Sequence, residues 1–312
     1  MIDDYNKIIE SLNIKFIRTN SLNVIKSVRI HNFYDVQNTL FLVNKGKITL
    51  AENDVATAGD IIFIPGGRST EITFGAVEAE EINNETFINK RELYFSPIQM
   101  EHEDFIHLDE ADLTNFISVT FDVKAFDSVN FFTSLDFPPF IIHQSSSLKD
   151  TVDQIYDENG SNKAGRSRII NNLTEYLIIE VFRYILESKM FVEQLATNSN
   201  YFKDSRLIDI FNYIKDNIAG DLSNKTLASV ANVSEDYVGQ YFKMLTGINP
   251  QDYIEYQRME KAVDLLRTSK KSIRAIGAEV GYKDTAYFCR RFKMMFGIPA
   301  GKMRKRDSLI DI

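Results

Sequence analysis

The spacing of hydrophobic and polar positions changes once along the chain, from alternation typical of strands to the spacing typical of helices. Between about Leu22 and Thr120, short apolar runs are separated by turn residues. The run 38–43, the turn 44–46 and the run 47–50 together predict a β-hairpin. Short strands at this spacing favour a β-sandwich or a small barrel.

From about Leu148 onward, apolar residues recur every three or four positions. The strongest segment is Ser167 to Ser188, whose apolar surface is wide enough to be buried on more than one side. Such a helix either fills the core of its own domain or pairs two subunits, and both interpretations stay open. The residues predicted for a pairing surface are Ile169, Leu173, Tyr176 and Leu177.

Two segments in the last third of the chain are copies of one pattern. Residues 237–248 and 287–298 are identical at six positions, which are occupied by Tyr, Phe, Lys, Met, Gly and Ile. At helical spacing, each copy has one apolar stripe and one polar row on the opposite face. The stripes consist of Val238, Tyr241, Phe242 and Leu245 in the first copy and Phe288, Phe292 and Met295 in the second.

Capping residues before each copy predict that a further short helix precedes the helix of the copy. Ser223 and Ser272 are suited to cap the first helix of each pair, and Ser234 and Asp284 the second. Asn232 stands where a helix ends with a positive φ angle, a conformation that asparagine tolerates. Two short helices around a tight turn predict a helix-turn-helix, whose second helix enters the major groove of DNA.

The order and spacing of these residues resemble the AraC/XylS family of bacterial transcription regulators, from about Leu207 to Arg304. The matching positions include Leu227-Ala228, Phe242-Lys243, Gly247, Pro250, Tyr253, Arg258, Ala262, Ile276, Val280-Gly281-Tyr282, Arg291-Phe292-Lys293, Phe296-Gly297 and Pro299. The chain departs from the pattern at Gly277, where alanine is usual, and near Met303, where an aromatic residue is usual. The second departure predicts a shorter last helix.

The polar rows of the two copies supply candidate DNA contacts. Arg290 has the planar fork that matches the O6 and N7 atoms of guanine. Arg291 lies nearer the packed side and is suited to a phosphate, and Asp236 either accepts from a cytosine amino group or caps its helix. The predicted DNA-binding residues are Ser234, Asp236, Gln240, Lys243, Thr285, Ala286, Arg290, Arg291 and Lys293.

The charge of the chain is unevenly distributed. The whole protein has a net charge of -8, but residues 201–312 hold 19 Lys and Arg against 14 Asp and Glu, a net charge of +5. Residues 1–200 hold 17 against 30, a net charge of -13. Residues 235–245 carry -1 and residues 284–296 carry +2. Because phosphate neutralisation dominates non-specific affinity, we expect the second unit to supply most of it, while the first discriminates or docks less deeply.

The first half resembles the cupin-like arm of the same family, at the turn around Gly46 and in the segment from Gly59 to Pro65. The resemblance implies a small-molecule effector in this domain and helices that pair two subunits. The expected fold class is α+β: a β-sandwich or cupin-like barrel followed by helices, then an all-α domain with two helix-turn-helix units. The expected boundaries are 1–145 for the regulatory domain, 146–195 for the dimerisation helices, 196–204 for a linker and 205–306 for the DNA-binding domain.

Two other functions compete with control by a small molecule. A protein partner is one, because the acidic first half does not favour an anionic effector unless a base such as Arg68 compensates. A closed, packed barrel interior would favour it. A metal-dependent cupin enzyme is the other, but the four histidines, His31, His102, His107 and His143, lack the one-residue spacing of a metal pair. For residues 101–104, Glu-His-Glu-Asp, we expect a solvated loop, and we expect no cofactor and no metal.

The remaining features favour a cytoplasmic protein. The N-terminus is acidic and lacks the regions of a signal peptide. No apolar run approaches the ~18 residues that a membrane-spanning helix requires. The single cysteine, Cys289, excludes a disulfide within the chain. The sequence therefore predicts a cytoplasmic, dimeric, DNA-binding regulator, without indicating activation or repression.

Overall fold

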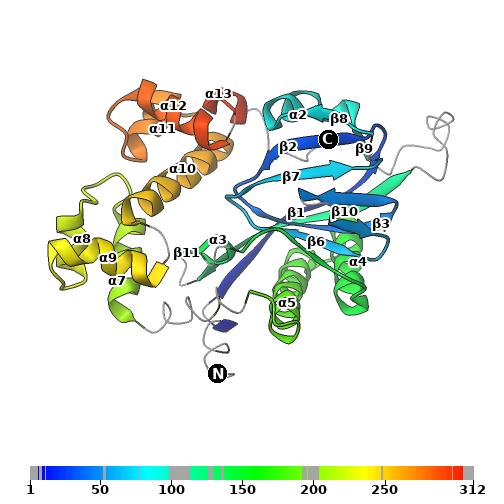
Figure 1. Ribbon diagram of the computed structural model, residues 1–312, viewed down its shortest axis with the longest axis horizontal. Coiled ribbons are helices and arrows are strands. Elements are labelled where there is room, and N and C mark those ends of the chain that lie inside the picture. Colours follow the sequence, from blue (N-terminus) through cyan, green and yellow to red (C-terminus); the bar gives the residue numbers. More distant parts are fainter. Residues whose placement is uncertain are drawn as a thin grey trace. The chain divides into compact units, whose positions relative to one another are not determined.

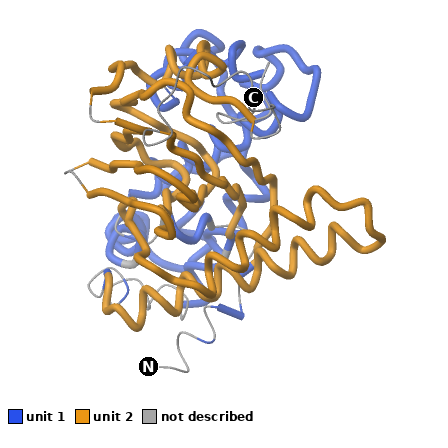
Figure 2. The backbone as a smooth tube through the Cα atoms, turned by 90° about the vertical axis from the view of Figure 1, so that its right-hand side faces the viewer, with its two compact units in different colours: residues 1–12, 124–136, 191–308 blue, residues 13–123, 137–190, 309–312 orange. Residues whose placement is uncertain are grey.

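The computed structural model divides the chain into two compact units (Figure 2). We call residues 13–123, 137–190 and 309–312 the sheet unit, and residues 1–12, 124–136 and 191–308 the helical unit. The structure describes residues 6, 9–10, 12–51, 54–76, 78–97, 113–125, 129–134, 137–191, 195, 204–246, 249–296 and 298–304. Apart from Asp204, the predicted linker lies outside these residues, as does the segment 101–104.

Two sheets make up the strand layers (Figure 1). Sheet A has the order β12-β6-β3-β10-β1-β9, with β11 on the end of β10, and sheet B has the order β5-β4-β7-β2-β8. The pairing of β2 with β8 is parallel, whereas the pairs β1–β9, β10–β11, β3–β10, β6–β12, β2–β7, β3–β6, β4–β5 and β4–β7 are antiparallel. The strands are β1 (Leu12–Val24), β2 (Val28–Tyr34), β3 (Asn38–Lys45), β4 (Lys47–Leu50), β5 (Val55–Thr57), β6 (Ile61–Ile64), β7 (Ser69–Phe74), β8 (Glu80–Ile82), β9 (Phe95–Pro97), β10 (Thr114–Ala125), β11 (Val129–Asn130) and β12 (Phe140–Ile142).

The predicted hairpin around Gly46 is wrong, because β3 and β4 lie in different sheets. Strand β3 pairs with β6 and β10, whereas β4 pairs with β5 and β7. Gly46 joins them with a φ of +75°, and a Cβ atom added there would lie 2.2 Å from Oγ1 of Thr114. Only glycine fits this close approach, at which the chain turns from one sheet to the other.

Phenylalanine rings fill part of the space between the sheets. Phe41 of β3 and Phe116 of β10 belong to sheet A, and their ring centroids lie 5.4 Å apart. Phe41 also meets Phe74 of β7 at 5.7 Å and Phe33 of β2 at 6.5 Å, both in sheet B. All four side chains are fully or almost fully buried. The two sheets therefore share one apolar core.

Helices α4 (Ser146–Gly160) and α5 (Arg166–Glu187) pack against each other and cover the other face of sheet A (Figure 1). Ile169 and Tyr176 are each 45% exposed and Leu173 is half-buried. Leu177 is fully buried, so it belongs to the core of its own subunit. This corrects its place in the predicted pairing surface, because a residue without exposed surface cannot contact a second chain.

His31 lies between two glutamates on the exposed face of sheet B. Its Nδ1 is 2.9 Å from Oε2 of Glu71 on β7, and its Nε2 is 3.3 Å from Oε2 of Glu81 on β8. The hydrogen bond to Glu71, followed by that to Glu81, raises the pKa of His31 above 6.5. Only the protonated ring donates from both nitrogens. The stabilisation is therefore complete below pH ~6.5 and is lost as the pH rises through the higher pKa of the folded protein.

The expected result of an NMR titration is a pKa for His31 above that of an unfolded histidine, about 6.5. The variant Glu71→Gln should lower this pKa, because the hydrogen bond to Glu71 contributes most to raising it. His143, in the same unit, serves as an internal reference because its acidic partner is Asp60 and not Glu71. A His31 pKa that is the same with and without Glu71 would contradict the bridging geometry.

The described helices of the helical unit form two groups on either side of a long helix, α10 (Figure 1). Helix α10 packs against α9 on one side and against α11 and α13 on the other. The bounds are α7 (Ser205–Asp216), α8 (Asn224–Val230), α9 (Glu235–Thr246), α10 (Pro250–Thr268), α11 (Ile273–Glu279), α12 (Thr285–Phe296) and α13 (Ala300–Met303). The remaining short helices are α2 (Asn84–Lys90), the 3-10 turn η2 (Arg91–Leu93) and α3 (Phe131–Ser134).

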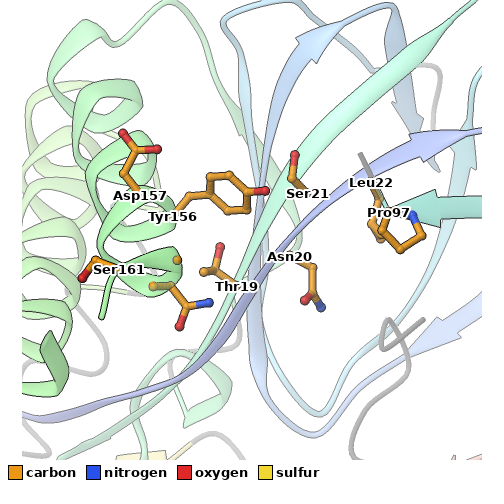
Figure 3. Close-up of a pocket in the computed structure, with 10 residues that line it drawn as sticks. Thr19, Asn20, Ser21, Leu22, Pro97, Tyr156, Asp157 and Ser161 are labelled. Atoms are coloured by element: carbon orange, nitrogen blue, oxygen red, sulfur yellow. The ribbon is translucent and has the colours of Figure 1, made fainter. Parts of the chain in front are cut away.

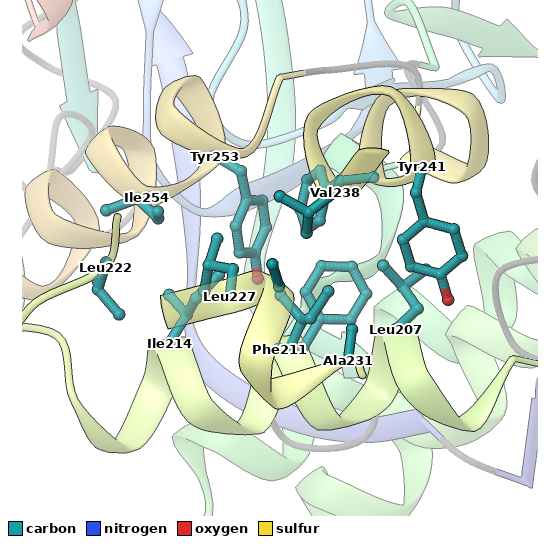
Figure 4. Packing of buried hydrophobic residues seen from close by; sticks show 13 residues of the cluster. Leu207, Phe211, Ile214, Leu222, Leu227, Ala231, Val238, Tyr241, Tyr253 and Ile254 are labelled. Carbon is teal, nitrogen blue, oxygen red and sulfur yellow. The ribbon is translucent and has the colours of Figure 1, made fainter. Parts of the chain in front are cut away.

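Each group has its own aromatic core. In the first, Phe211 of α7 lies 5.6 Å from Phe242 of α9 and 5.1 Å from Tyr253 of α10, measured between ring centroids (Figure 4 shows this cluster). In the second, the buried stripe of α12 consists of Phe288, Phe292 and Phe296. Met295, predicted for that stripe, is only half-buried, because Phe296 occupies the inward position. The side chain of Leu245 is outside the described residues. The fold class is α+β, as the sequence predicts.

Candidate nucleic-acid interface

The first helix-turn-helix is formed by α8 and α9, and its turn is closed by two backbone hydrogen bonds. Val233 N donates to the carbonyl of Ala228 over 3.0 Å, and Asn232 N donates to the carbonyl of Ser229 over 3.3 Å. This pair of bonds is the Schellman motif, which needs a left-handed residue just after the helix. Asn232 has a φ of +52°, which confirms the predicted helix stop.

The second helix-turn-helix, α11 and α12, closes its turn with the same pair of bonds. Tyr282 N donates to the carbonyl of Gly277 and Gly281 N to that of Ala278, and Gly281 has a φ of +94°. Helix α11 begins 49 residues after α8, whereas α12 begins 50 residues after α9. The second turn is therefore one residue longer, and the exposed Lys283 is the additional residue.

Replacing Gly281 with alanine is expected to lower the free energy of unfolding by at least about 2 kcal/mol. The left-handed conformation alone costs an L-residue about 1–2 kcal/mol. In addition, the new Cβ would lie 2.9 Å from the guanidinium of Arg258, which would have to move. Asn232→Ala is the control at a left-handed position without a new contact, and its loss should be smaller because asparagine already has a Cβ atom there. Equal losses for the two variants in urea denaturation would contradict the close contact with Arg258.

The residues predicted on α9 are all exposed, as are most of those on α12. Ser234, Asp236, Gln240 and Lys243 are exposed, and the carbonyl of Ser234 accepts from the N–H groups of residues 237 and 238. On α12, Ala286, Arg290 and Lys293 are exposed and Thr285 is half-buried. Asp284 caps α12, as predicted, by accepting from Tyr287 N over 2.6 Å. Exposure makes these side chains available to a groove, and their DNA contacts stay a prediction.

Sequence reasoning missed four exposed apolar side chains on the two recognition helices. Tyr237 and Met244 of α9 are 43% and 61% exposed, and Tyr287 and Met294 of α12 are 47% and 65% exposed. Each Tyr–Met pair is seven residues apart, which places both on one side of the helix. The repeat held the signal, since these positions are identical in both copies although neither is needed in the core.

Arg291 differs from the other predicted residues because it already has a partner. Its guanidinium makes a bidentate ion pair with the carboxylate of Glu255 on α10, and this hydrogen bond raises the pKa of Arg291. Both side chains are partly buried. Contact with a phosphate would require Arg291 to leave this pair. Its role in the free protein is to position α12 against α10.

Three polar residues on one side of α10 connect it to both helix-turn-helix units. We call Gln251, Glu255 and Arg258 the bridging stripe; their spacing of four and then three residues places them on one face. Gln251 Nε2 donates to the carbonyl of Leu222 over 3.0 Å, just before α8. Glu255 holds α12 through Arg291. The stripe was not predicted, although Arg258 is among the positions that match the family pattern.

Arg258 contacts the two units at once. Its Nε donates to the carbonyl of Ile218 over 2.9 Å and its Nη2 to that of Gly220 over 3.2 Å, in the segment between α7 and α8. The guanidinium carbon also lies 6.0 Å from the ring centroid of Tyr282, in the turn of the second unit. Burial raises the pKa of Tyr282, so the phenol stays neutral beside this cation. The bridging stripe therefore fixes the two recognition helices on one support.

Comparison with known proteins agrees with this architecture. A family model described as a helix-turn-helix domain matches residues 227–306. An HTH-type transcriptional regulator of Haemophilus influenzae is 24% identical over 279 residues, which is 86% of each chain. The arabinose operon regulatory protein of Escherichia coli is 31% identical over 134 residues, 42% of this chain and 44% of that protein. A crystal structure of ToxT K231A from Vibrio cholerae aligns with a TM-score of 0.49 at 9% identity, covering 94% of this chain and 96% of that one.

The match to the family model begins in α8 and runs past α12, so it spans both helix-turn-helix units and α10 between them. Two relatives that align over 86% and 79% of this chain are transcriptional regulators of the helix-turn-helix type. The geometry supplies what such a protein needs, namely two exposed recognition helices on one rigid connector. The chain is therefore a DNA-binding transcription regulator whose C-terminal region carries a helix-turn-helix domain similar to that of AraC-type regulators.

Proposed function

We propose that α9 and α12 enter successive major grooves on one face of the DNA, about 34 Å apart. The observation that carries the proposal is the bridging stripe, because it ties both units to α10 and so sets their spacing. The proposed contacts are Ser234, Asp236, Gln240, Lys243, Thr285, Ala286, Arg290 and Lys293, with Arg291 positioning α12. Tyr237 and Tyr287 join them, since both rings are exposed near the helix N-termini.

The recognition helices α9 and α12 differ in net charge, so we assign them different roles in DNA binding. Residues 284–296 carry a net charge of +2, and residues 235–245 carry -1. Helix α12 therefore supplies most of the phosphate attraction, with Arg290 reading guanine. Helix α9 contributes discrimination through Gln240 and Asp236, which hold hydrogen-bonding groups but little positive charge.

Selection of bound fragments from a genomic DNA pool by the full-length protein tests this function. Enriched fragments should share two short conserved blocks whose centres are about 10.5 base pairs apart. One block should contain guanine where Arg290 reads it. Enrichment without any shared sequence, or a single block, would contradict reading by two helices.

A small-molecule effector in the N-terminal domain is proposed to control DNA binding. Thr39 of β3 and Thr120 of β10 are opposite each other in the register and about 1% exposed. Neither hydroxyl has a hydrogen-bond partner within the described part of the chain. They lie on the face of sheet A that carries Phe41, which is toward sheet B. Buried hydroxyls without partners support a polar ligand inside the barrel, next to the region that phenylalanine rings already fill.

Control by a protein partner is the alternative, and the closed packing of Phe33, Phe41, Phe74 and Phe116 is the observation that favours it. Thermal-shift screening of the full-length protein separates the two. Stabilisation by a small molecule supports the effector, whereas no stabilisation by any compound supports the partner.

The remaining proposals concern organisation. We place the regulatory domain at 1–145, the dimerisation helices at 146–195, the linker at 196–204 and the DNA-binding domain at 205–306. A homodimer would pair through the exposed face of α5 that carries Ile169, Leu173 and Tyr176. We assign no enzymatic activity and a cytoplasmic location. No described helix is long and apolar enough to cross a membrane, and the described residues hold no cluster of metal-ligating side chains.

A further inference from the structure

A pocket of about 480 Å³ lies in the sheet unit, between β1 and the C-terminal end of α4 (Figure 3). Residues 19–22 of β1 and Pro97 of β9 form one side, and residues 156, 157 and 159–161 form the other. Its volume lies in the range of small-molecule sites. The pocket is on the side of sheet A that faces the helices, so it is separate from the space between the two sheets.

The β1 side of the pocket has polar atoms without partners. Thr19 is only 4% exposed, and its hydroxyl has no hydrogen-bond partner among the described residues. The same holds for the side-chain nitrogen of the neighbouring Asn20. A buried donor or acceptor without a partner costs about 1–3 kcal/mol. Valine would pack β1 against the helix as well as threonine does, without a buried hydroxyl. The hydroxyl of Thr19 therefore indicates a ligand that forms a hydrogen bond with it.

The α4 side adds further hydrogen-bonding groups at fixed positions. Tyr156 reaches from α4 toward Ser21, with Thr19 beside it (Figure 3). Asn159 is held by Arg166 at the start of α5, because its Oδ1 accepts from Nη2 over 2.7 Å. This bond uses the amide oxygen of Asn159 and leaves its amide nitrogen available to donate to a ligand. Donors and acceptors therefore line both sides of the pocket.

The charge of the lining disfavours an anionic ligand. Asp157 is the charged residue among those that line the pocket, and none of the described lining residues is Lys, Arg or His. The C-terminal end of the 15-residue helix α4 adds a partial negative charge. A ligand without negative charge that carries several hydroxyl or amide groups matches both the polar atoms and this field.

We propose that the pocket binds a small uncharged molecule bearing hydroxyl or amide groups, and that filling it changes affinity for DNA. The second part rests on the proposed effector control. Strand β1 contacts α5 as well, since Phe16 N donates to Oδ1 of Asn171 over 3.2 Å. A ligand between β1 and α4 therefore clamps the α4–α5 hairpin to sheet A. That hairpin carries the exposed face formed by Ile169 and Tyr176.

A fragment screen on the full-length protein tests the site. The probes are a library of uncharged hydroxyl- and amide-bearing fragments, with matched carboxylates of the same size. Uncharged fragments should shift the methyl NMR signals of Thr19 and Leu22, and their carboxylate counterparts should not. Binding of the carboxylates alone, or no shift with any uncharged fragment, would overturn the site.

Thr19→Val and Tyr156→Phe are the matched variants, because each removes one hydroxyl and little volume. Thr19→Val should keep or raise the melting temperature and weaken fragment binding about tenfold, the effect of one hydrogen bond. A lowered melting temperature with unchanged fragment affinity would show a structural hydroxyl and overturn the assignment. If Thr19→Val does not fold, Tyr156→Phe decides by the same fragment affinity.

DNA binding by the ligand-free protein, measured in parallel, separates this inference from the proposed function. A fragment that occupies the pocket should change affinity for the selected DNA at least twofold. Occupation without any such change would overturn the regulatory part while leaving DNA recognition intact. Loss of DNA binding in the ligand-free protein would instead count against the proposed function and not against the pocket.

Discussion

Replacing Arg290 with alanine is expected to weaken binding to the selected DNA by about 10- to 100-fold, the effect of one lost bidentate contact to guanine. Replacing Gln240 with alanine should cost less at low salt, because no charge is removed. The loss for Arg290→Ala should come with a relaxed preference for guanine at the contacted position, and the dependence of log K on log salt should stay unchanged for Gln240→Ala. Fluorescence anisotropy across a series of salt concentrations measures both quantities.

Arg274→Ala is the control for the loss of charge alone. Arg274 is exposed on α11 in the same unit, but it is not on a recognition helix. Its replacement should reduce affinity less than that of Arg290 and leave base preference unchanged. Equal losses for Arg290→Ala and Gln240→Ala, with unchanged preference at every base pair, would contradict the division of labour between α12 and α9.

The helix caps, turns and buried helix faces of the DNA-binding region could be predicted because they depend on residues close in sequence. Ser223, Ser272 and Asp284 accept hydrogen bonds from N–H groups three residues later, as their cap positions require. Asn232 adopts the positive φ that its place after a helix indicates. The inward positions of Phe242 and Phe292 follow from helical spacing alone. Such features need no knowledge of the tertiary fold.

The errors arose where long-range contacts decide the structure. The residues around Gly46 have the pattern of a hairpin, but Thr114, 68 positions later, packs against that glycine as the chain changes sheets. Leu177 was placed on a pairing surface because α5 carries apolar residues around most of its circumference. Helical spacing alone does not tell which of them pack within the subunit. A single α5 helix thus carries a buried face and an exposed one, which periodicity could not distinguish.

The role of Arg291 could not be predicted for a related reason. Its neighbours in sequence indicate a basic row suited to phosphate, and nothing within a few residues supplies a carboxylate for it. Glu255, its partner, lies 36 positions away on α10. The pair exists because the tertiary fold brings Glu255 of α10 beside α12, and local sequence patterns do not indicate that contact. Arg258 lies on the same helix, and its replacement has the largest expected effect on the free energy of unfolding.

Arg258 is positioned to hold the two helix-turn-helix units together. Its two hydrogen bonds go to backbone carbonyls of Ile218 and Gly220 in the first unit, while its guanidinium lies beside Gly281 and Tyr282 in the second. Hydrogen bonds from a charged donor contribute about 1.5–3 kcal/mol each. Arg258→Ala leaves both carbonyls without this donor, so we expect the free energy of unfolding to fall by about 3 kcal/mol.

Arg258→Ala should also loosen the spacing of the recognition helices. The wild-type protein should bind DNA whose two conserved blocks are about 10.5 base pairs apart more tightly than DNA in which this spacing is changed by two base pairs. The variant should lose most of that preference. Arg258→Lys should fall between the two, because one ammonium cannot reproduce the planar fork. Arg274→Ala, which removes an exposed arginine from the same domain, should change stability by less than about 0.5 kcal/mol. If Arg258→Ala matched that control in denaturation and kept the spacing preference, α10 would not be the support that sets the distance between α9 and α12.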